Sequence, residues 1–275
     1  MKFQNMVTHV NQPWAMVENN LGQMLKVFDG YLNKDILALD KVIEEKAFFS
    51  SEKSIVDAWE LKELANGIVE MTIDGTFVPK TYGLNPYCGM VPTQGIEKVI
   101  QDLESAGTQT LIMKVSSAGG AVTGVPELVK TIKNSSMKTI AFIDELACSA
   151  GYWVASTCDH VFATQSAMIG SIGVYIAITK RNTENSSYKT NYFSAGEKKL
   201  YGASNIPLTE SEAKSFQDSV NQTYDWFCSD VASNRNVSLE EVKKTEAGVY
   251  RANQAEWLVD EVTTYNELIT TLQEM

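Results

Sequence analysis

One serine hydroxyl, that of Ser149, stands among small residues in the stretch ELACSAGYW, which covers residues 145–153. Small side chains let a backbone and a substrate come close together. A serine at the beginning of a helix also lies where backbone N–H groups point outward. This is a common setting for a nucleophile, so Ser149 is a candidate for acyl transfer, provided that another group accepts its proton.

The usual base for a nucleophilic serine is histidine, and the chain contains two, His9 and His160. His160 begins the predicted strand HVFAT, at the opposite end from the loop that would carry a site. We interpret it as a surface residue and keep it only as an alternative base. His9 lies in the N-terminal region and fits no better. Asp144 and Glu145 precede the serine, but a carboxylate is a poor base for a hydroxyl without a histidine between them.

Lysine is the remaining candidate for the base. A lysine with its ordinary pKa of about 10.4 is protonated at neutral pH, whereas burial in an apolar site lowers that pKa and frees the amine. Serine–lysine pairs are a known form of nucleophilic catalysis. The stretch YFSAGEKKLYG supplies Lys198 and Lys199. Adjacent lysines in a polar loop are more often solvated, so the residues alone leave this open. We expect an extended segment, in which only one of the two side chains faces a site.

A pair of glycines offers N–H donors for a developing anion. The stretch SSAGGAV, residues 116–122, follows a predicted buried strand. Gly119 and Gly120 could form only a tight turn, but glycines also allow N–H groups to face a ligand. One of these N–H groups, together with that of Ala150, would form an oxyanion hole for acyl transfer. A third loop of small residues, AMIGSIGV at residues 167–174, also follows a predicted strand.

These loops lie where strands and helices alternate, which is typical of an α/β fold with a mainly parallel sheet. In such a sheet, ligands bind at the carboxyl ends of the strands. The core is predicted to begin near Gly67, and the last third, from Thr209, to be mostly helical. The predicted helices are residues 95–106, AVTGVPELVKTIKN and SAGYWVAST, and the predicted strands are TLIMKVS, KTIAFI, HVFAT, SIGVYIAIT and TNYFSA.

The first part of the chain has a different pattern. Apolar residues recur at helical spacing from Pro13 to about Leu32 and again over roughly Ile55 to Leu64. We therefore predict a helical appendage at residues 1–65, followed by one large domain at residues 66–275. The apolar stripe of the appendage is interpreted as a packing surface.

Composition argues against several partners. The chain has 34 acidic and 23 basic residues, for a net charge of -11, whereas nucleic acids and anionic membranes bind clustered Lys and Arg. The N-terminus lacks the apolar core of a signal peptide and no apolar run is long enough for a membrane span, so we expect a cytoplasmic protein. The four cysteines show no C-x-x-C spacing, and Cys158 with His160 is too few ligands for a metal. No metal and no cofactor are predicted.

Several of these stretches together resemble a known family. In chain order they are SSAGGAV, ACSAGYW, IGSIGV, SAGEKK with the following PLT, and VYRANQAEWLVDEV. The set resembles the signal peptide peptidase A family of serine–lysine peptidases, from about Gly67 to Val262. This implies the spiral α/β fold of the Clp protease and crotonase group. Pro13-Trp14 followed by a predicted helix is similar to the bacteriophage head-maturation proteases, a subgroup of that family.

The resemblance implies a role for each site residue. Counting back from Pro207-Leu208-Thr209 puts the family's lysine on Lys199, with Lys198 where a histidine is frequent. Ala118 and Trp257 depart from common family residues, as does alanine at position 150, but these changes leave the nucleophile, the lysine and the glycine pair in place. The implied site consists of Ser149 as nucleophile, Lys199 as general base, Gly120 (or Gly119) and Ala150 as the oxyanion hole, and Ser171 as a hydroxyl that orients the lysine.

The implied activity is that of a serine endopeptidase acting on scaffold or capsid proteins during phage head maturation, in the host cytoplasm or inside the assembling head. The resemblance also implies a closed homo-oligomer in which neighbouring subunits help to build the active site. The alternatives are a bacterial housekeeping peptidase of the same family that degrades signal peptides or proteins, and a non-enzymatic assembly scaffold. Acyl-CoA chemistry of the crotonase type also occurs on this fold, and fold alone does not set function.

Overall fold

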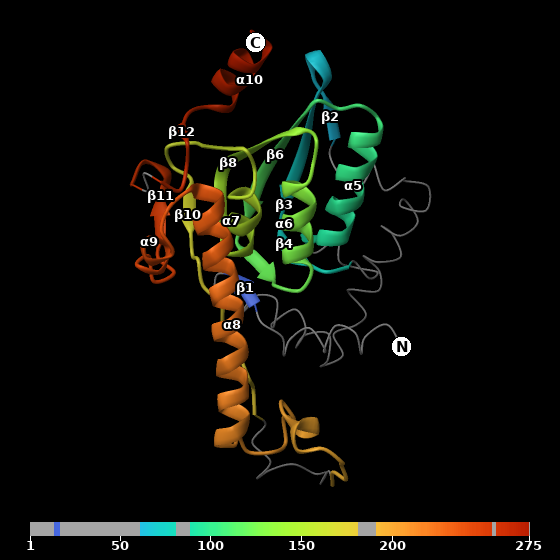
Figure 1. Ribbon diagram of the computed structural model, residues 1–275, viewed down its shortest axis with the longest axis vertical. Helices are drawn as coiled ribbons and strands as arrows, with labels where there is room; N and C mark the ends of the chain where they lie inside the picture. Colours follow the sequence, from blue (N-terminus) through green and yellow to red (C-terminus); the bar gives the residue numbers. More distant parts are fainter. Residues whose placement is uncertain (1–13, 17–60, 81–88, 181–190, 255–256, 275) are drawn as a thin grey trace, which may run out of the picture.

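A computed structural model of the chain describes residues 14–16, 61–80, 89–180, 191–254 and 257–274. Its centre is an α/β core in which strands β3, β6, β8 and β10 run parallel, within a sheet ordered β11-β10-β8-β6-β3-β2 (Figure 1). A smaller sheet, ordered β1-β7-β4-β5, lies at one end of it. The α/β fold with a parallel core, predicted from the alternation of strands and helices, is confirmed.

The larger sheet is built from β2 (Leu61–Glu63), β3 (Ile68–Asp74), β6 (Thr110–Ser117), β8 (Lys138–Cys148), β10 (Met168–Gly170) and β11 (Val249–Arg251), with β9 (His160–Ala163) on β8 and β12 (Glu261–Val262) on β9. The smaller sheet is built from β1 (Trp14–Met16), β4 (Thr76–Val78), β5 (Met90–Pro92) and β7 (Gly119–Ala121). The α-helices are α5 (Thr93–Ser105), α6 (Val125–Lys133), α7 (Ala150–Ala155), α8 (Glu210–Arg235), α9 (Leu239–Lys243) and α10 (Tyr265–Gln273), and the 3-10 turns are η1 (Ala65–Gly67), η3 (Glu197–Leu200) and η4 (Ala252–Gln254).

The core forms because successive side chains of each strand point to opposite faces of the sheet. In β6, Leu111 and Met113 face the main core, which also contains the buried sides of α5, α6 and α7. Ile112, between them, faces the other side, where α10 covers the sheet through Leu268. Helices therefore cover both faces, and the strands that end at the candidate site are buried.

The N-terminal predictions are partly wrong where they can be compared with the structure. Residues 14–16 form a strand paired with β7, and residues 61–63 form a strand paired with β3, although both were predicted to be helical. Strand pairing overrides the local helical spacing there, with a partner far along the chain for residues 14–16 and a nearby one for residues 61–63. The rest of residues 1–60 lies outside the described residues, so the division at residues 65 and 66 remains a prediction.

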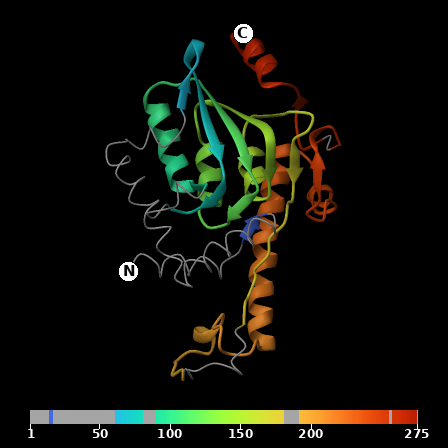
Figure 2. The same cartoon turned by 180° about the vertical axis from the view of Figure 1, so that it is seen from behind.

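A long arm extends from the core. We use this name for residues 174–180, residues 191–209 and the first half of α8. Helix α8 has 26 residues, which gives a length of about 39 Å at 1.5 Å per residue. Figures 1 and 2 show its C-terminal half against the core and its N-terminal half projecting beyond the sheets, with residues 191–209 at the far end.

Two strand predictions fall in or beside this arm and are wrong. Residues 171–179 and residues 191–195 form no regular strand. The strand in this part of the chain is β10, which ends at Gly170 just before the predicted one begins. Two of the apolar residues in this stretch, Val174 and Tyr175, instead line a cavity against α8.

Candidate active site

Ser149 lies at the carboxyl end of β8, in the residue that precedes α7. Its φ of 56° and ψ of −122° fall in a region that side-chain-bearing residues rarely occupy, at a cost of roughly 1–3 kcal/mol. The Ser149 N–H donates to the carbonyl of Gly170 at 2.8 Å, and its own carbonyl accepts from the Trp153 N–H at 2.9 Å. A sharp turn from strand to helix held in this way is a known means of presenting a nucleophilic serine.

The small residues next to Ser149 are required by close packing. A Cβ atom on Gly151 would lie 2.8 Å from the carbonyl oxygen of Ser117, at the end of β6. The two aromatics that follow fix the helix behind the serine. Tyr152 donates to the Leu258 carbonyl at 2.9 Å, and the Trp153 indole N–H donates to Asp230 at 2.9 Å. Both aromatic side chains are fully buried, so α7 is a rigid platform.

The hydroxyl of Ser149 has a partner in this arrangement. Its Oγ donates to the carbonyl of Gly173 at 3.2 Å, and the residue is 1% exposed. To act as a nucleophile, the hydroxyl has to exchange this carbonyl for a base. The neighbouring thiol does not compete with it, because burial raises the pKa of Cys148 to about 12 and thiol reactivity requires the thiolate.

The glycine pair lies in β7, an inner strand of the smaller sheet between β1 and β4 that contacts α7. The Gly119 N–H donates to Ser117 Oγ at 3.1 Å, so Gly120 fits a donor role toward a ligand better than Gly119 does. Only glycine fits at position 120, since a Cβ there would lie 2.2 Å from the Phe77 carbonyl oxygen. The N–H of Ala150 belongs to the first residue of α7, where N–H groups have no acceptor within the helix.

Ser171 lies beside Ser149 because β8 and β10 are parallel and in register. Cys148 pairs with Gly170, so the residues that follow these two are neighbours. Ser171 has a φ of 52°, and its N–H donates to the Gly248 carbonyl at 2.7 Å. With Gly173 it also borders a cavity of about 380 Å³ between residues 173–175 and α8. The structure thus brings together the three predicted loops at the carboxyl ends of β6, β8 and β10.

Lys199 does not join this group within one chain. It lies on η3 at the far end of the arm, and both Lys198 and Lys199 are exposed. Gly202, three residues later, is bonded to Glu212 in the first turn of α8. Phe227, which packs on Trp153 in the core, lies fifteen residues after Glu212 on the same helix, a distance of about 22 Å along its axis. The predicted extended segment is also wrong, because these lysines lie in a 3-10 turn, where adjacent side chains point about 120° apart.

His160 is far from Ser149, as predicted. It begins β9 opposite Ile140, eight positions before Cys148 along β8, a separation of about 26 Å at 3.3 Å per residue. His9 lies outside the described residues. Within the part of the chain that the structure describes, no group of three His, Cys, Asp or Glu side chains could hold a metal ion, and no helix is long and apolar enough to cross a membrane.

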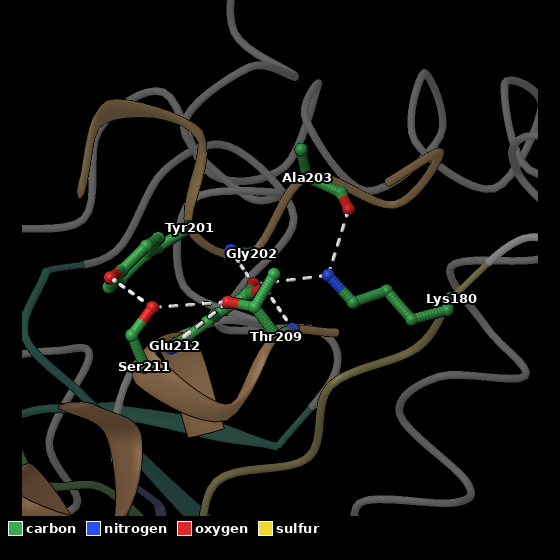
Figure 3. Close-up of polar contacts among 7 residues, drawn as sticks. All are labelled: Lys180, Tyr201, Gly202, Ala203, Thr209, Ser211 and Glu212. Atoms are coloured by element: carbon green, nitrogen blue, oxygen red, sulfur yellow. Dashed lines mark hydrogen bonds and ion pairs between the residues drawn. The ribbon is translucent and has the colours of Figure 1, made fainter. Parts of the chain in front are cut away.

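Two groups were not predicted from the sequence. One is the carbonyl of Gly173, which holds the Ser149 hydroxyl; no residue pattern identifies such a backbone acceptor. The other is a polar cluster in the arm around Glu212 and Lys180, drawn in Figure 3. For Glu212 there was a signal, since Thr209 followed three residues later by glutamate is a helix-capping pattern.

The fold defined by these elements is that of the Clp protease. A ClpP1 mutant from Listeria monocytogenes superposes with a TM-score of 0.50 over 73% of this chain and 94% of that chain, at 14% sequence identity. Identity this low shows the fold alone. The sequence identifies the family, since residues 131–275, more than half of the chain, match the profile of peptidase family S49. The chain belongs to this family, which is the signal peptide peptidase A family.

The relatives include phage and cellular proteins. The chain is 27% identical over 219 residues to "Capsid assembly protease C" of Escherichia phage lambda, covering 77% of this chain and 50% of that protein. It is 25% identical over 245 residues to "Putative signal peptide peptidase SppA" of Enterococcus faecium, covering 83% of this chain and 69% of that protein. The chain spans about half the length of the first curated relatives it matches.

Proposed function

We propose that this protein is a serine endopeptidase in which Ser149 is the nucleophile and Lys199, from a neighbouring copy of the chain, is the general base. The observation that carries the proposal is the strained φ of 56° at Ser149, at the meeting point of three loops. Strain of this kind persists where the surroundings over-determine it, and it clusters at active sites. A buried serine with only a structural role would gain nothing from it.

The proposed reaction begins when the neutral Lys199 amine replaces the Gly173 carbonyl as partner of the hydroxyl. The amine takes the proton from Oγ, and Oγ attacks the carbonyl carbon of the scissile peptide. The N–H groups of Gly120 and Ala150 hold the resulting oxyanion. The lysine then gives its proton to the departing amine, which leaves an acyl-enzyme. A water that loses a proton to the same lysine hydrolyses this ester and restores Ser149.

Two features support a base that comes from another copy. One is the distance along α8 between the turn of Lys199 and the core. The other is the surface of the arm, where Phe193 is 95% exposed and Leu208 is 50% exposed, on the same segment as Lys199. Large apolar side chains exposed in this way are typical of an interaction surface. A second copy would cover them and remove Lys199 from water, as a neutral lysine requires.

Mixing two inactive variants tests the shared site. Ser149→Ala and Lys199→Ala are each expected to be inactive alone. If the dyad forms between copies, roughly a quarter of the sites in random mixed oligomers are intact, because each site takes its serine from one subunit and its lysine from another. A peptidase assay before and after mixing at equal concentrations measures this. A mixture that stays inactive despite proven subunit exchange would contradict the proposal.

For the biological role we propose cleavage of scaffold or capsid proteins during assembly of a phage head, with an active homo-oligomer. Support comes from the lambda capsid assembly protease among the relatives. The signal peptide peptidase of Enterococcus faecium favours the second candidate, a cellular peptidase that degrades signal peptides. Incubating the protein with phage head proteins and with signal peptides, followed by mass spectrometry of the fragments, separates the two. Cleavage of signal peptides alone would overturn the phage role.

A further inference from the structure

A buried carboxylate lies in the first turn of α8, far from Ser149. Glu212 is 2% exposed, and it is the single buried residue among those described between positions 191 and 222. Its Oε1 accepts from the Gly202 N–H at 2.6 Å and from Lys180 Nζ at 3.0 Å, and its Oε2 accepts from the Thr209 N–H at 3.4 Å (Figure 3). Burying a charge is costly unless such partners offset it.

Helix capping accounts for only part of this arrangement. The chain contains a second capping box of the same kind, Thr264 with Glu267 at the start of α10. There the glutamate is exposed, and among the described residues its carboxylate accepts from the neighbouring Thr263 and Thr264 alone. The capping role therefore needs neither burial nor distant partners, and the contacts of Glu212 with Gly202 and Lys180 call for another explanation.

Those two contacts fix the turn that carries Lys199. The backbone from Lys198 to Ala203 is closed by successive hydrogen bonds, Tyr201 N–H to the Lys198 carbonyl at 3.2 Å and Ala203 N–H to the Leu200 carbonyl at 3.0 Å. Glu212 holds Gly202 within this turn, and Lys180 donates to the Ala203 carbonyl at 3.0 Å. We infer that Glu212 is a positioning residue that locks the Lys199 turn onto the end of α8, with Lys180 as its counter-charge. The inference rests on the proposed function of Lys199.

The cluster also separates the roles of two lysines in the arm. The Lys180 ammonium donates both to a buried carboxylate and to a carbonyl, so its protons are engaged within its own chain. Lys199 is exposed on the turn η3, which ends just before Gly202. Lys180 thus has the chemistry of a fixed structural cation, whereas Lys199 is available to a neighbouring site.

Glu212→Gln and Glu267→Gln form a matched pair of variants, because each replaces the carboxylate of a capping-box glutamate with a carboxamide. Glutamine at position 212 can keep its amide oxygen toward Gly202 and Lys180 only by turning its NH2 group toward the Thr209 N–H, and in either orientation Lys180 loses its counter-charge. We expect Glu212→Gln to lower kcat by roughly 10- to 100-fold at nearly constant KM, the effect of misplacing a catalytic group by about 1 Å. Glu267→Gln should keep the wild-type kcat. Sedimentation of both variants checks that assembly is retained.

A double variant distinguishes positioning from general loosening of the fold. In the Lys199→Ala background, Glu212→Gln should cause no further loss of the residual hydrolysis of an activated ester. A further loss there, or a wild-type kcat for Glu212→Gln, would overturn the inference while leaving the dyad intact. Full activity of Lys199→Ala would instead refute the proposed function itself.

A separate observation concerns the glycine strand. Strand β7 is paired on one edge with β4, through Phe77 and Gly120, and on the other with β1, whose Ala15 pairs antiparallel with Gly120. If the Gly120 N–H holds the oxyanion, the substrate backbone has to run beside β7. Peptides commonly bind by adding a strand to a sheet edge, and the edge in question is the one that β1 takes up.

We further infer that β1 occupies the place of a substrate strand and that a substrate has to displace it. This also rests on the proposed function. Ala15→Pro disrupts the strand by fixing φ and removing an N–H. Ala15→Ser is the control, because serine leaves φ free and keeps the backbone N–H. We expect Ala15→Pro to lower KM by about three- to tenfold, because more molecules have the edge open, and Ala15→Ser to match wild type. An unchanged or higher KM in Ala15→Pro would overturn this inference. The assignment of Ser149 as nucleophile would still stand if the wild type is active and Ser149→Ala is inactive.

Discussion

The core around Ser149 and the arm that carries Lys199 are built in opposite ways. Every residue from Ala147 to Thr157 is buried, and the backbone of Ser149 is bonded to Gly170 at the end of β10 and to Trp153 in α7. In the arm, nearly every described residue from 191 to 222 is exposed or half-buried, and one polar cluster around Glu212 gives it order. The proposed nucleophile is therefore held within the core of one chain, whereas the proposed base lies on an exposed surface of the arm.

The largest expected effect is loss of the nucleophile. Ser149→Ala should lower kcat/KM by a factor on the order of 10⁴ or more, since removing the nucleophile of such a site leaves only binding contributions. The fold should persist, because the backbone contacts of this residue do not use Oγ. A peptidase assay and a thermal melt measure both. Ordinary turnover by the pure variant would refute the assignment.

Substitution with glycine sharpens the same point. Glycine adopts positive φ readily, so Ser149→Gly should remove strain that Ser149→Ala retains. Both variants should be inactive, but Ser149→Gly should have the higher Tm. An equal Tm for the two would mean that the turn stores no strain.

The lysines of the arm come next. Lys199→Ala should lower activity by about 10³-fold or more, as expected when an essential proton acceptor is lost. Lys199→Arg should not restore it, because a guanidinium keeps its proton near neutral pH. Lys198→Ala is the matched control and should cost only a small factor. An inactive Lys198→Ala with an active Lys199→Ala would shift the assignment by one residue, and activity in both would end the serine–lysine mechanism and restore His160 as a candidate.

The contrast between core and arm also predicts that substituting a phenylalanine destabilises the fold in the core but not in the arm. Phe227 is fully buried and stacks on Trp153, with ring centroids 4.4 Å apart and planes within 8° of parallel. Phe227→Ala should lower the free energy of unfolding by about 3–5 kcal/mol. The same change at the exposed Phe193 should cost within roughly 0.5 kcal/mol in the free chain but weaken assembly. Denaturant melts and sedimentation of both variants measure this. A large stability loss in Phe193→Ala would show that the arm is packed in the free chain.

The sequence predicted the core well because local pattern and tertiary position agree there. Apolar residues of α5 such as Ile96 and Ile100 recur at helical spacing and are the ones that are buried. The grouping of Ser149, Gly120 and Ser171 was also predictable, because parallel strands that end at one edge bring their loops together.

The arm and the N-terminal strands could not be predicted in this way. Ala15 pairs with Gly120, more than a hundred residues away, so the residues around it carry no signal of that strand. Lys62 pairs with Glu70, eight residues away, but the helical spacing of the apolar residues before it indicated a helix instead of this short strand. The distance of Lys199 from Ser149 follows from the length of α8 as it leaves the core. Spacing in the sequence identified which lysine matches the family, but it holds no information on which copy of the chain that lysine serves.

The smallest predicted effect concerns acid stability at the base of α8. Burial alone would raise the pKa of Asp260, but the Arg235 guanidinium and the Val161 N–H outweigh this and hold the pKa below its ordinary value of 3.8. Arg235 Nη2 lies 2.7 Å from Asp260 Oδ1. A carboxylate whose pKa is lower in the folded than in the unfolded state contributes stability above the unfolded value, and this contribution is lost as the pH falls through the folded one. We therefore expect Tm to fall below about pH 4 partly through this pair.

Asp260→Asn isolates that contribution. The variant should have a lower Tm at pH 7, since it leaves the largely buried Arg235 without its carboxylate, and a shallower loss of Tm between about pH 5 and pH 3. Lys98 and Asp102 form a surface pair whose side chains are both about half exposed. Asp102→Asn is thus the control and should change Tm little, as exposed ion pairs contribute about 0–1 kcal/mol. Parallel acid limbs for Asp260→Asn and wild type would show that the Asp260 carboxylate makes no contribution to the loss of stability in acid.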